Sequence, residues 1–152
     1  MVQDMSSESN SINKKERRVT VKRISHFNAA HRLNVPQWSS TENEQFFGLC
    51  NNEYYHGHNY KIEVWVTGLV NSISGYVIDM KELQKIINEE VILAWDHKNL
   101  NLQTEEFKNL NPTAENIVIC AYDKIKKRID SNFDLKIILH ETERNIVEYE
   151  GQ

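Results

Sequence analysis

The stretch HGHNYKIEVWVT, residues 56–67, decides the fold, because polar and apolar side chains alternate along it. Successive side chains of a β-strand point to opposite faces, so every second residue shares a face. One face therefore carries two histidines followed by Tyr60, Ile62, Val64 and Val66. The other carries mostly polar groups. The stretch predicts a strand that buries one face and begins with two imidazoles on that same face.

The segments around this strand predict an α+β domain. Apolar residues keep helical spacing after Asp79, to about Trp95, and again after Thr113, to about Ile129. Strands are expected over 19–27, 56–67, 135–141 and 146–149, with a short returning strand starting at 76–78. This order, ββααββ, predicts an antiparallel four-stranded sheet with two helices on one face.

The composition limits the classes of function. Residues 1–18 form a polar, then basic, N-terminal tail that cannot fold alone, which leaves 19–152 as a single domain. The net charge of −4 gives no support for a nucleic-acid partner, and no apolar run is long enough to span a membrane. The N-terminus lacks a secretory h-region, and Cys50 and Cys120 fit free thiols in a reducing compartment. A cytoplasmic location is expected.

The two histidines at the start of the central strand are a candidate metal site. His56 and His58 face the same side, and Gly57 between them allows close approach of another group. A catalytic zinc usually takes three protein ligands and keeps one position open. His31, after the small residues Ala29 and Ala30, is the third candidate. Ordinary hydrogen-bonded strand histidines are the competing interpretation, and His26 and His140 keep it.

Several short motifs occur together in one order from about residue 19 to residue 151. They are FNAAH at 27–31, FGLCNN at 47–52, HGHNY at 56–60, DHKNL at 96–100, TAEN at 113–116, and ET at 141–142 followed by Asn145. This set resembles the 6-pyruvoyl-tetrahydropterin synthase family. The resemblance implies the tunnelling fold, one Zn²⁺ per subunit, and a homohexamer of two trimers with sites at subunit interfaces. It also implies a lyase that converts 7,8-dihydroneopterin triphosphate to 6-pyruvoyl-tetrahydropterin and releases triphosphate, in tetrahydrobiopterin biosynthesis.

The resemblance assigns a role to each matching residue. His31, His56 and His58 become the zinc ligands, and Cys50, Asp96 and His97 become the catalytic group. Glu141 becomes the anchor of the pterin ring, and Thr113 a second substrate contact beside Ala114, where many relatives carry another hydroxyl. The chemistry is compatible with these roles. Zinc near substrate hydroxyls acidifies a neighbouring C–H, a thiolate takes the proton, and a carboxylate accepts two parallel donors from the ring.

Three alternatives stay open at the level of sequence. Glu53, three residues before His56, is a candidate base for side-chain cleavage to 6-hydroxymethyl-7,8-dihydropterin, and a third branch makes 6-carboxy-tetrahydropterin. A zinc-stabilised interaction domain is the non-enzyme alternative, with Cys50 as a fourth ligand. The residues that hold the triphosphate are not fixed, and Arg23, Arg32 and Lys98 are candidates.

Overall fold

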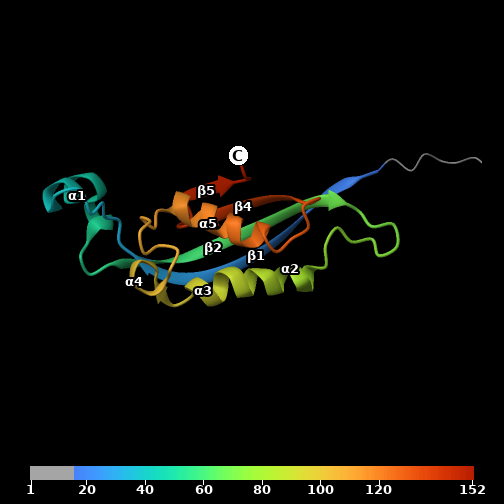
Figure 1. Ribbon diagram of the computed structural model, residues 1–152, viewed down its shortest axis with the longest axis horizontal. Helices are drawn as coiled ribbons and strands as arrows, with labels where there is room; N and C mark the ends of the chain where they lie inside the picture. Colours follow the sequence, from blue (N-terminus) through green and yellow to red (C-terminus); the bar gives the residue numbers. More distant parts are fainter. Residues whose placement is uncertain (1–15) are drawn as a thin grey trace, which may run out of the picture.

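A computed structural model describes residues 16–152 of the chain. A single sheet of five strands, in the order β3-β1-β2-β4-β5, forms its centre. Figure 1 shows the four longer strands, β1, β2, β4 and β5. The strands are β1 (Arg18–His31), β2 (His56–Leu69), β3 (Lys98–Asn99), β4 (Asp134–His140) and β5 (Ile146–Tyr149). Strands β1, β2, β4 and β5 pair antiparallel, and β3 pairs parallel with the end of β1.

Residues 16–152 contain seven helical segments, and two of them begin at N-caps that the sequence predicted. They are α1 (Ser40–Phe47), η1 (Gly48–Asn51), α2 (Met80–Ile87), η2 (Asn88–Ile92), α3 (Leu93–Trp95), α4 (Leu100–Gln103) and α5 (Ala114–Lys126). The carboxylate of Asp79 accepts from the backbone N–H of Lys81, and the Thr113 hydroxyl accepts from that of Asn116. Both predicted N-caps are confirmed. Segments α2, η2 and α3 follow one another without a break, with one π-helical turn at η2.

One face of the sheet is covered by helices. The alternation predicted for β2 is confirmed, since Tyr60, Ile62, Val64 and Val66 are fully buried. They pack in one cluster with apolar side chains of α2, α5 and β4, including Leu83, Ile117, Ile125, Ile137 and Leu139. The other face carries polar and aromatic groups, among them Trp65, whose ring lies 3.4 Å from the Lys22 ammonium. The helix-covered face is therefore the hydrophobic core.

The sheet differs from the predicted one in two places. The four predicted antiparallel strands occur as β1, β2, β4 and β5, but the two-residue β3 adds a fifth, parallel strand. The returning strand expected from Tyr76 does not form. The Tyr76 carbonyl accepts from the N–H of Asn71 and closes a loop, so the chain passes directly into the Asp79 cap. The first strand also begins at Arg18 and ends at His31, so it is longer than predicted.

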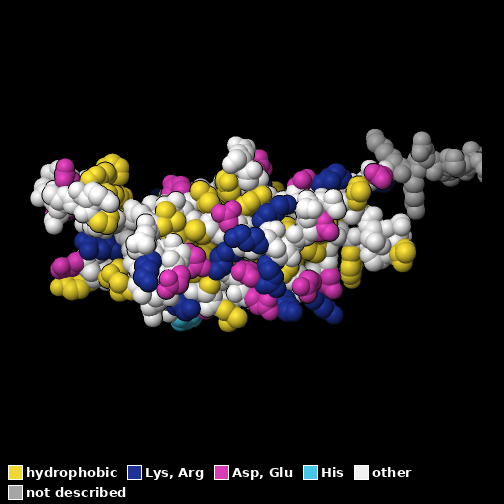
Figure 2. Space-filling view, in the orientation of Figure 1, with side chains coloured by type: hydrophobic (Ala, Val, Ile, Leu, Met, Phe, Trp, Pro, Cys, Tyr) yellow, Lys and Arg dark blue, Asp and Glu magenta, His cyan; other side chains and the backbone are white. Residues whose placement is uncertain are grey.

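The remaining sequence predictions concern the N-terminal tail, membrane-spanning segments and surface charge. Most of the predicted tail, residues 1–15, lies outside the described residues, while Arg18 already pairs with Asp134 of β4. No helix in residues 16–152 has the length and hydropathy needed to cross a bilayer. Charges of both signs mix over the face that Figure 2 shows, whereas hydrophobic side chains gather over α1. Phe46 of α1 and the following Leu49 are largely exposed.

Candidate metal centre and active site

Three histidines meet at one end of the sheet. His31 ends β1 and lies directly opposite His56, the first residue of β2, while His58 lies opposite Ala29. The strand alternation places all three on the helix-covered face. One ligand atom from each lies within 4.8 Å of the others. Antiparallel register therefore brings together two residues that are two positions apart along β2 and one that precedes them by 25 positions or more in the chain.

The polar atoms of this cluster fit a metal ion. The Nδ1–H of His31 donates to the Pro112 carbonyl at 2.7 Å, because a carbonyl can only accept. Its Nε2 is buried with no hydrogen-bond partner, and so are both ring nitrogens of His56. Buried polar atoms without partners are rare and call for an explanation. A cation held between the three imidazoles supplies one, and a carbonyl on the far nitrogen is the usual support of a metal-binding histidine.

The protonation state of the cluster also suits a metal. Burial lowers the pKa of His31 to about 4, although the hydrogen bond to Pro112 opposes this shift. Burial lowers the pKa of His56 too, with repulsion from His58 as the second cause. Neutral imidazole is the form that binds metals. His31 and His56 are therefore held in the metal-binding form at neutral pH.

Gly57 is required by the close approach of β1 and β2 at this site. A Cβ atom on residue 57 would lie 3.2 Å from the carbonyl oxygen of Ala29 on the paired strand. That distance is tighter than ordinary van der Waals contact, and the carbonyl belongs to the backbone of a paired strand. The missing side chain thus lets the strands pair at the register that sets His31 opposite His56.

Glu141 follows β4 and points its carboxylate at the cluster. One oxygen, Oε1, lies 3.5 Å from Nε2 of His31 and 3.6 Å from Nε2 of His58, and the side chain is 15% exposed. Its backbone N–H donates to the Asn145 carbonyl, which fixes the turn. The sequence predicted that Glu141 shares the apolar face of β4, but gave no indication that it would contact the histidines.

Cys50 lies close to this centre, in η1. Its carbonyl accepts from the N–H of Leu33, and its thiol is half-buried. Burial raises the pKa of the Tyr60 hydroxyl, and the neighbouring Glu141 and Cys50 raise it further. Tyr60, two residues beyond His58 on the same face, also lies 3.4 Å from Nδ1 of His31. Sequence reasoning did not single out Tyr60 for the site, although the strand alternation contained the signal.

Asp96 and His97 form a hydrogen-bonded pair at the edge of the sheet. Oδ2 of Asp96 lies 2.8 Å from Nδ1 of His97, while Oδ1 accepts from the backbone N–H of Asn28. That N–H is the main cause that lowers the pKa of Asp96. His97 has a φ of 58°, a left-handed conformation that is uncommon outside glycine. This irregular backbone lets two adjacent side chains face each other.

The imidazole of His97 points away from the rest of the chain. Its side chain is 79% exposed. With Asn28, Asn59 and Lys98 it borders an open hollow of about 430 Å³. Asn28 and Asn59 are exposed and, by strand alternation, face away from the helices. Within residues 16–152, neither Asp96 nor His97 makes a hydrogen bond with Cys50. The structure thus keeps the predicted catalytic group in two separate parts.

The remaining residues that the sequence proposed for the site lie in different environments. Thr113 caps α5 and directly follows Pro112, whose carbonyl supports His31. Each candidate for holding the triphosphate already donates within the chain: Arg23 to Gln84, Arg32 to the Asn51 carbonyl, and Lys98 to the Leu93 carbonyl. Glu53 is exposed in the turn before β2. The sequence did not indicate the supporting role of Pro112, because its carbonyl belongs to a loop 81 residues from His31.

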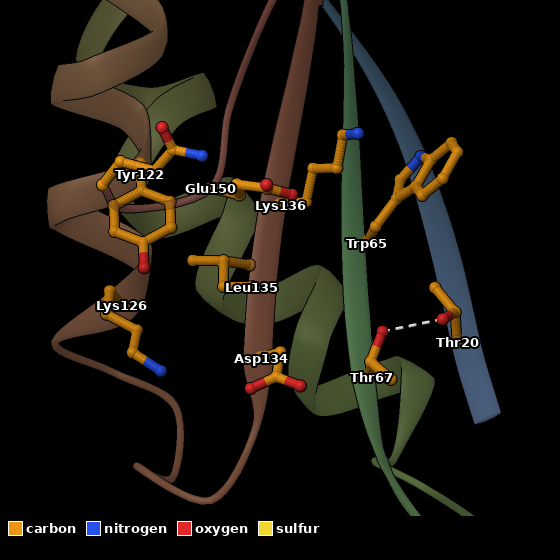
Figure 3. Close-up of a pocket in the computed structure, with 10 residues that line it drawn as sticks. Thr20, Trp65, Thr67, Tyr122, Lys126, Asp134, Leu135, Lys136 and Glu150 are labelled. Carbon is orange, nitrogen blue, oxygen red and sulfur yellow. Dashed lines mark hydrogen bonds between the residues drawn. The ribbon is translucent and has the colours of Figure 1, made fainter. Parts of the chain in front are cut away.

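A second hollow lies at the other end of the sheet and contains none of these groups. Figure 3 shows Trp65, Thr20 and Thr67 on one side of it, with the two threonine hydroxyls hydrogen-bonded at 2.7 Å, and Tyr122 of α5 opposite. Its volume is about 480 Å³. Its lining has no histidine, cysteine or pair of coupled acids, so the chemistry of the molecule is concentrated at the histidine end.

The chain thus combines an α+β fold with three convergent histidines that could hold a metal ion, an arrangement found in metal-dependent enzymes. A family model described as 6-pyruvoyl tetrahydropterin synthase matches residues 20–152. The chain belongs to this family and is an enzyme, a lyase. The 6-pyruvoyl tetrahydrobiopterin synthase of Homo sapiens is 37% identical over 131 residues, which cover 86% of this chain and 90% of that protein.

Two further relatives extend this comparison. The structure of Caenorhabditis elegans 6-pyruvoyl tetrahydropterin synthase superposes with a TM-score of 0.85 at 38% identity, covering 90% of this chain and 98% of that one. A dihydroneopterin monophosphate aldolase of Pyrococcus furiosus is 32% identical over 110 residues, 72% of this chain and 77% of that protein. Pterin chemistry is therefore common to the relatives, while the reactions in their names differ.

Proposed function

We propose that this chain is a zinc-dependent lyase that converts 7,8-dihydroneopterin triphosphate to 6-pyruvoyl-tetrahydropterin with elimination of triphosphate. The observation that carries the proposal is the set of three convergent histidines, two of which, His31 and His56, have buried ring nitrogens without hydrogen-bond partners. The family's place in tetrahydrobiopterin synthesis, and relatives named for that reaction, support the substrate and the product. A cytoplasmic location is proposed with it.

The three histidines would hold the zinc, and Pro112 keeps His31 in the tautomer that offers Nε2. When bound, zinc supplies Lewis acidity toward oxygen atoms of the substrate side chain, which acidifies the adjacent C–H bonds. Cys50, in the loop that leads into β2, takes the proton as its thiolate. The buried face around Tyr60 and Ile62 keeps bulk water from that side of the reacting carbon.

The Asp96–His97 pair is proposed to act on the site of a second subunit. Asp96 orients the imidazole through Nδ1, so Nε2 faces outward and can exchange a proton with substrate. The exposure of His97, and the absence of any bond between this pair and Cys50 in the described chain, favour action across an interface. A homohexamer of two trimers is the assembly proposed to bring the pair to its partner site.

The substrate ring is proposed to lie between Glu141 and Thr113. A carboxylate accepts two parallel donors from the amino group and ring N–H of a pterin. Both residues lie near His31, because Glu141 contacts its Nε2 and Pro112, which directly precedes Thr113, contacts its Nδ1. Ala114 follows Thr113 where a second hydroxyl would add a polar contact, so the ring has one hydrogen bond fewer here.

Cleavage of the substrate side chain is the alternative reaction. The aldolase among the relatives is the reason to include this reaction in the test. It would require Glu53 as the base, but that residue is exposed and precedes β2 in a turn. The direct test incubates the zinc-loaded protein with dihydroneopterin triphosphate and identifies the products by mass. We expect 6-pyruvoyl-tetrahydropterin and triphosphate. A hydroxymethyl or carboxy pterin as the main product would overturn the proposed reaction.

A further inference from the structure

Glu141 lies too close to the histidines to be explained by ring binding alone. Its Oε1 is 3.5 Å from Nε2 of His31 and 3.6 Å from Nε2 of His58, and only 15% of its side chain is exposed. The turn that follows β4 fixes its backbone through Asn145. The carboxylate therefore lies against the metal cluster itself, with no room for a pterin ring between them.

The contact between Glu141 and His31 lacks a proton. His31 carries its proton on Nδ1, where the Pro112 carbonyl accepts it, so Nε2 presents a lone pair. The carboxylate oxygen also presents lone pairs, and Nε2 has no hydrogen-bond partner. Two facing acceptors in a buried site repel each other. A cation bound by both atoms removes this conflict.

The distances suit a shared ion. Ligand atoms of a tetrahedral zinc, each bonded at about 2.0–2.1 Å, lie roughly 3.4 Å from one another. The separations of Oε1 from two of the three imidazole nitrogens are close to that value. The carboxylate of Glu141, with one oxygen within 3.6 Å of two of the imidazole nitrogens, is therefore the candidate for a fourth position.

We propose that Glu141 is the fourth ligand of the metal when no substrate is bound, and that the substrate side chain displaces it. This inference rests on the proposed function and deepens it. Three neutral imidazoles leave the charge of a divalent cation at +2, and the carboxylate lowers it to +1, which weakens the metal as a Lewis acid. The metal centre then gains its open position only when substrate arrives, and substrate binding itself activates it.

The two roles of Glu141 follow one another in this scheme. A pterin presents its ring donors at the end opposite its reactive side chain, so one carboxylate cannot hold the ring and the metal together. The flexible side chain of glutamate allows it to leave the metal and accept the ring donors. Glu141 would then carry its negative charge to the ring donors, and the three histidines would hold a metal able to act as a Lewis acid toward the substrate hydroxyls.

Cobalt(II) in place of zinc tests the inference, because its visible absorption reports the number and type of ligands. We compare the wild type with Glu141→Gln, which keeps the shape but removes the charge, and Glu141→Asp, which keeps the charge but shortens the reach. Glu143→Gln, exposed in the same turn, is the matched control. Metal affinity is measured by competition with a chelator, and circular dichroism checks folding.

We expect the Gln and Asp variants to bind cobalt at least about tenfold more weakly and to show altered spectra, while Glu143→Gln matches the wild type. Neopterin added to the wild type should shift its spectrum toward the altered form. Wild-type affinity and spectrum in Glu141→Gln or Glu141→Asp would overturn the inference, even where product formation stands. A wild type that binds no cobalt would overturn the proposed metal centre as well.

Discussion

The histidine cluster and the Asp96–His97 pair differ in how much of their surroundings one chain provides. The cluster is enclosed: His31 is fully buried, supported by Pro112, and faced by Glu141. The pair is fixed equally well at its backbone, through Asn28, but its imidazole is 79% exposed. A reaction that needs both the cluster and the pair must bring the exposed imidazole of His97 to an enclosed histidine cluster. The comparison teaches that one chain builds the candidate metal centre by itself, while the proposed proton shuttle faces outward.

Removing the thiol should give the largest effect at the enclosed end. Cys50→Ala should keep its zinc and lose turnover by about 10²- to 10⁴-fold, since a positioned base contributes that much. Product formation and zinc content measured on the same sample check both parts. Glu53→Gln is the control and should turn over normally. Loss of zinc with the thiol would instead make Cys50 a ligand.

Removing one imidazole should abolish the metal centre without affecting the pair at the edge. His58→Ala leaves two histidine ligands, so zinc affinity should fall by at least about a hundredfold. The His58 side chain is 21% exposed, and the fold is expected to survive its removal. Zinc content after dialysis, with His26→Ala as the control, measures the effect. Full zinc content in folded His58→Ala would place the metal elsewhere.

Widening the strand pair should disturb the cluster more mildly. In Gly57→Ala the added methyl meets the Ala29 carbonyl at 3.2 Å, so β1 and β2 must move apart slightly. We expect a loss of about 1–3 kcal/mol in the free energy of unfolding, as for other overpacked sites, together with weaker zinc binding. Urea unfolding with and without zinc separates the two effects. Unchanged stability would show that β1 and β2 can accommodate a methyl group here without a loss of packing.

The smallest effect is expected at the start of α5. Thr113→Ala removes the side-chain acceptor for the N–H of Asn116 and should cost about 1 kcal/mol of stability. Substrate affinity should fall as well if the hydroxyl contacts the ring. Thr113→Ser keeps the cap and is the matched control. A variant that loses stability but binds substrate normally would limit Thr113 to its structural role.

Much of the fold and part of the site could be predicted from sequence, for identifiable reasons. The alternation of polar and apolar residues over 56–67 and the helix caps Asp79 and Thr113 are local patterns. Each depends only on the backbone conformation of neighbouring residues, and each occurs in the structure as predicted. The short parallel β3 could not be predicted, since two residues show no alternation. The support of His31 by Pro112, and its contact with Glu141, arise from loops distant in the chain, whose positions depend on tertiary packing.

The central claim is that the enclosed metal centre of one chain works with the proton-shuttling Asp96–His97 pair of another chain. The most direct test mixes subunits of two inactive variants. Cys50→Ala and His97→Ala should each be inactive alone. Unfolded together in equal amounts and reassembled, they should recover about a quarter of wild-type turnover of dihydroneopterin triphosphate, because a site that draws on two chains is then intact by chance about one time in four. Mixed assemblies that stay inactive, while reassembled wild type is active, would contradict the account.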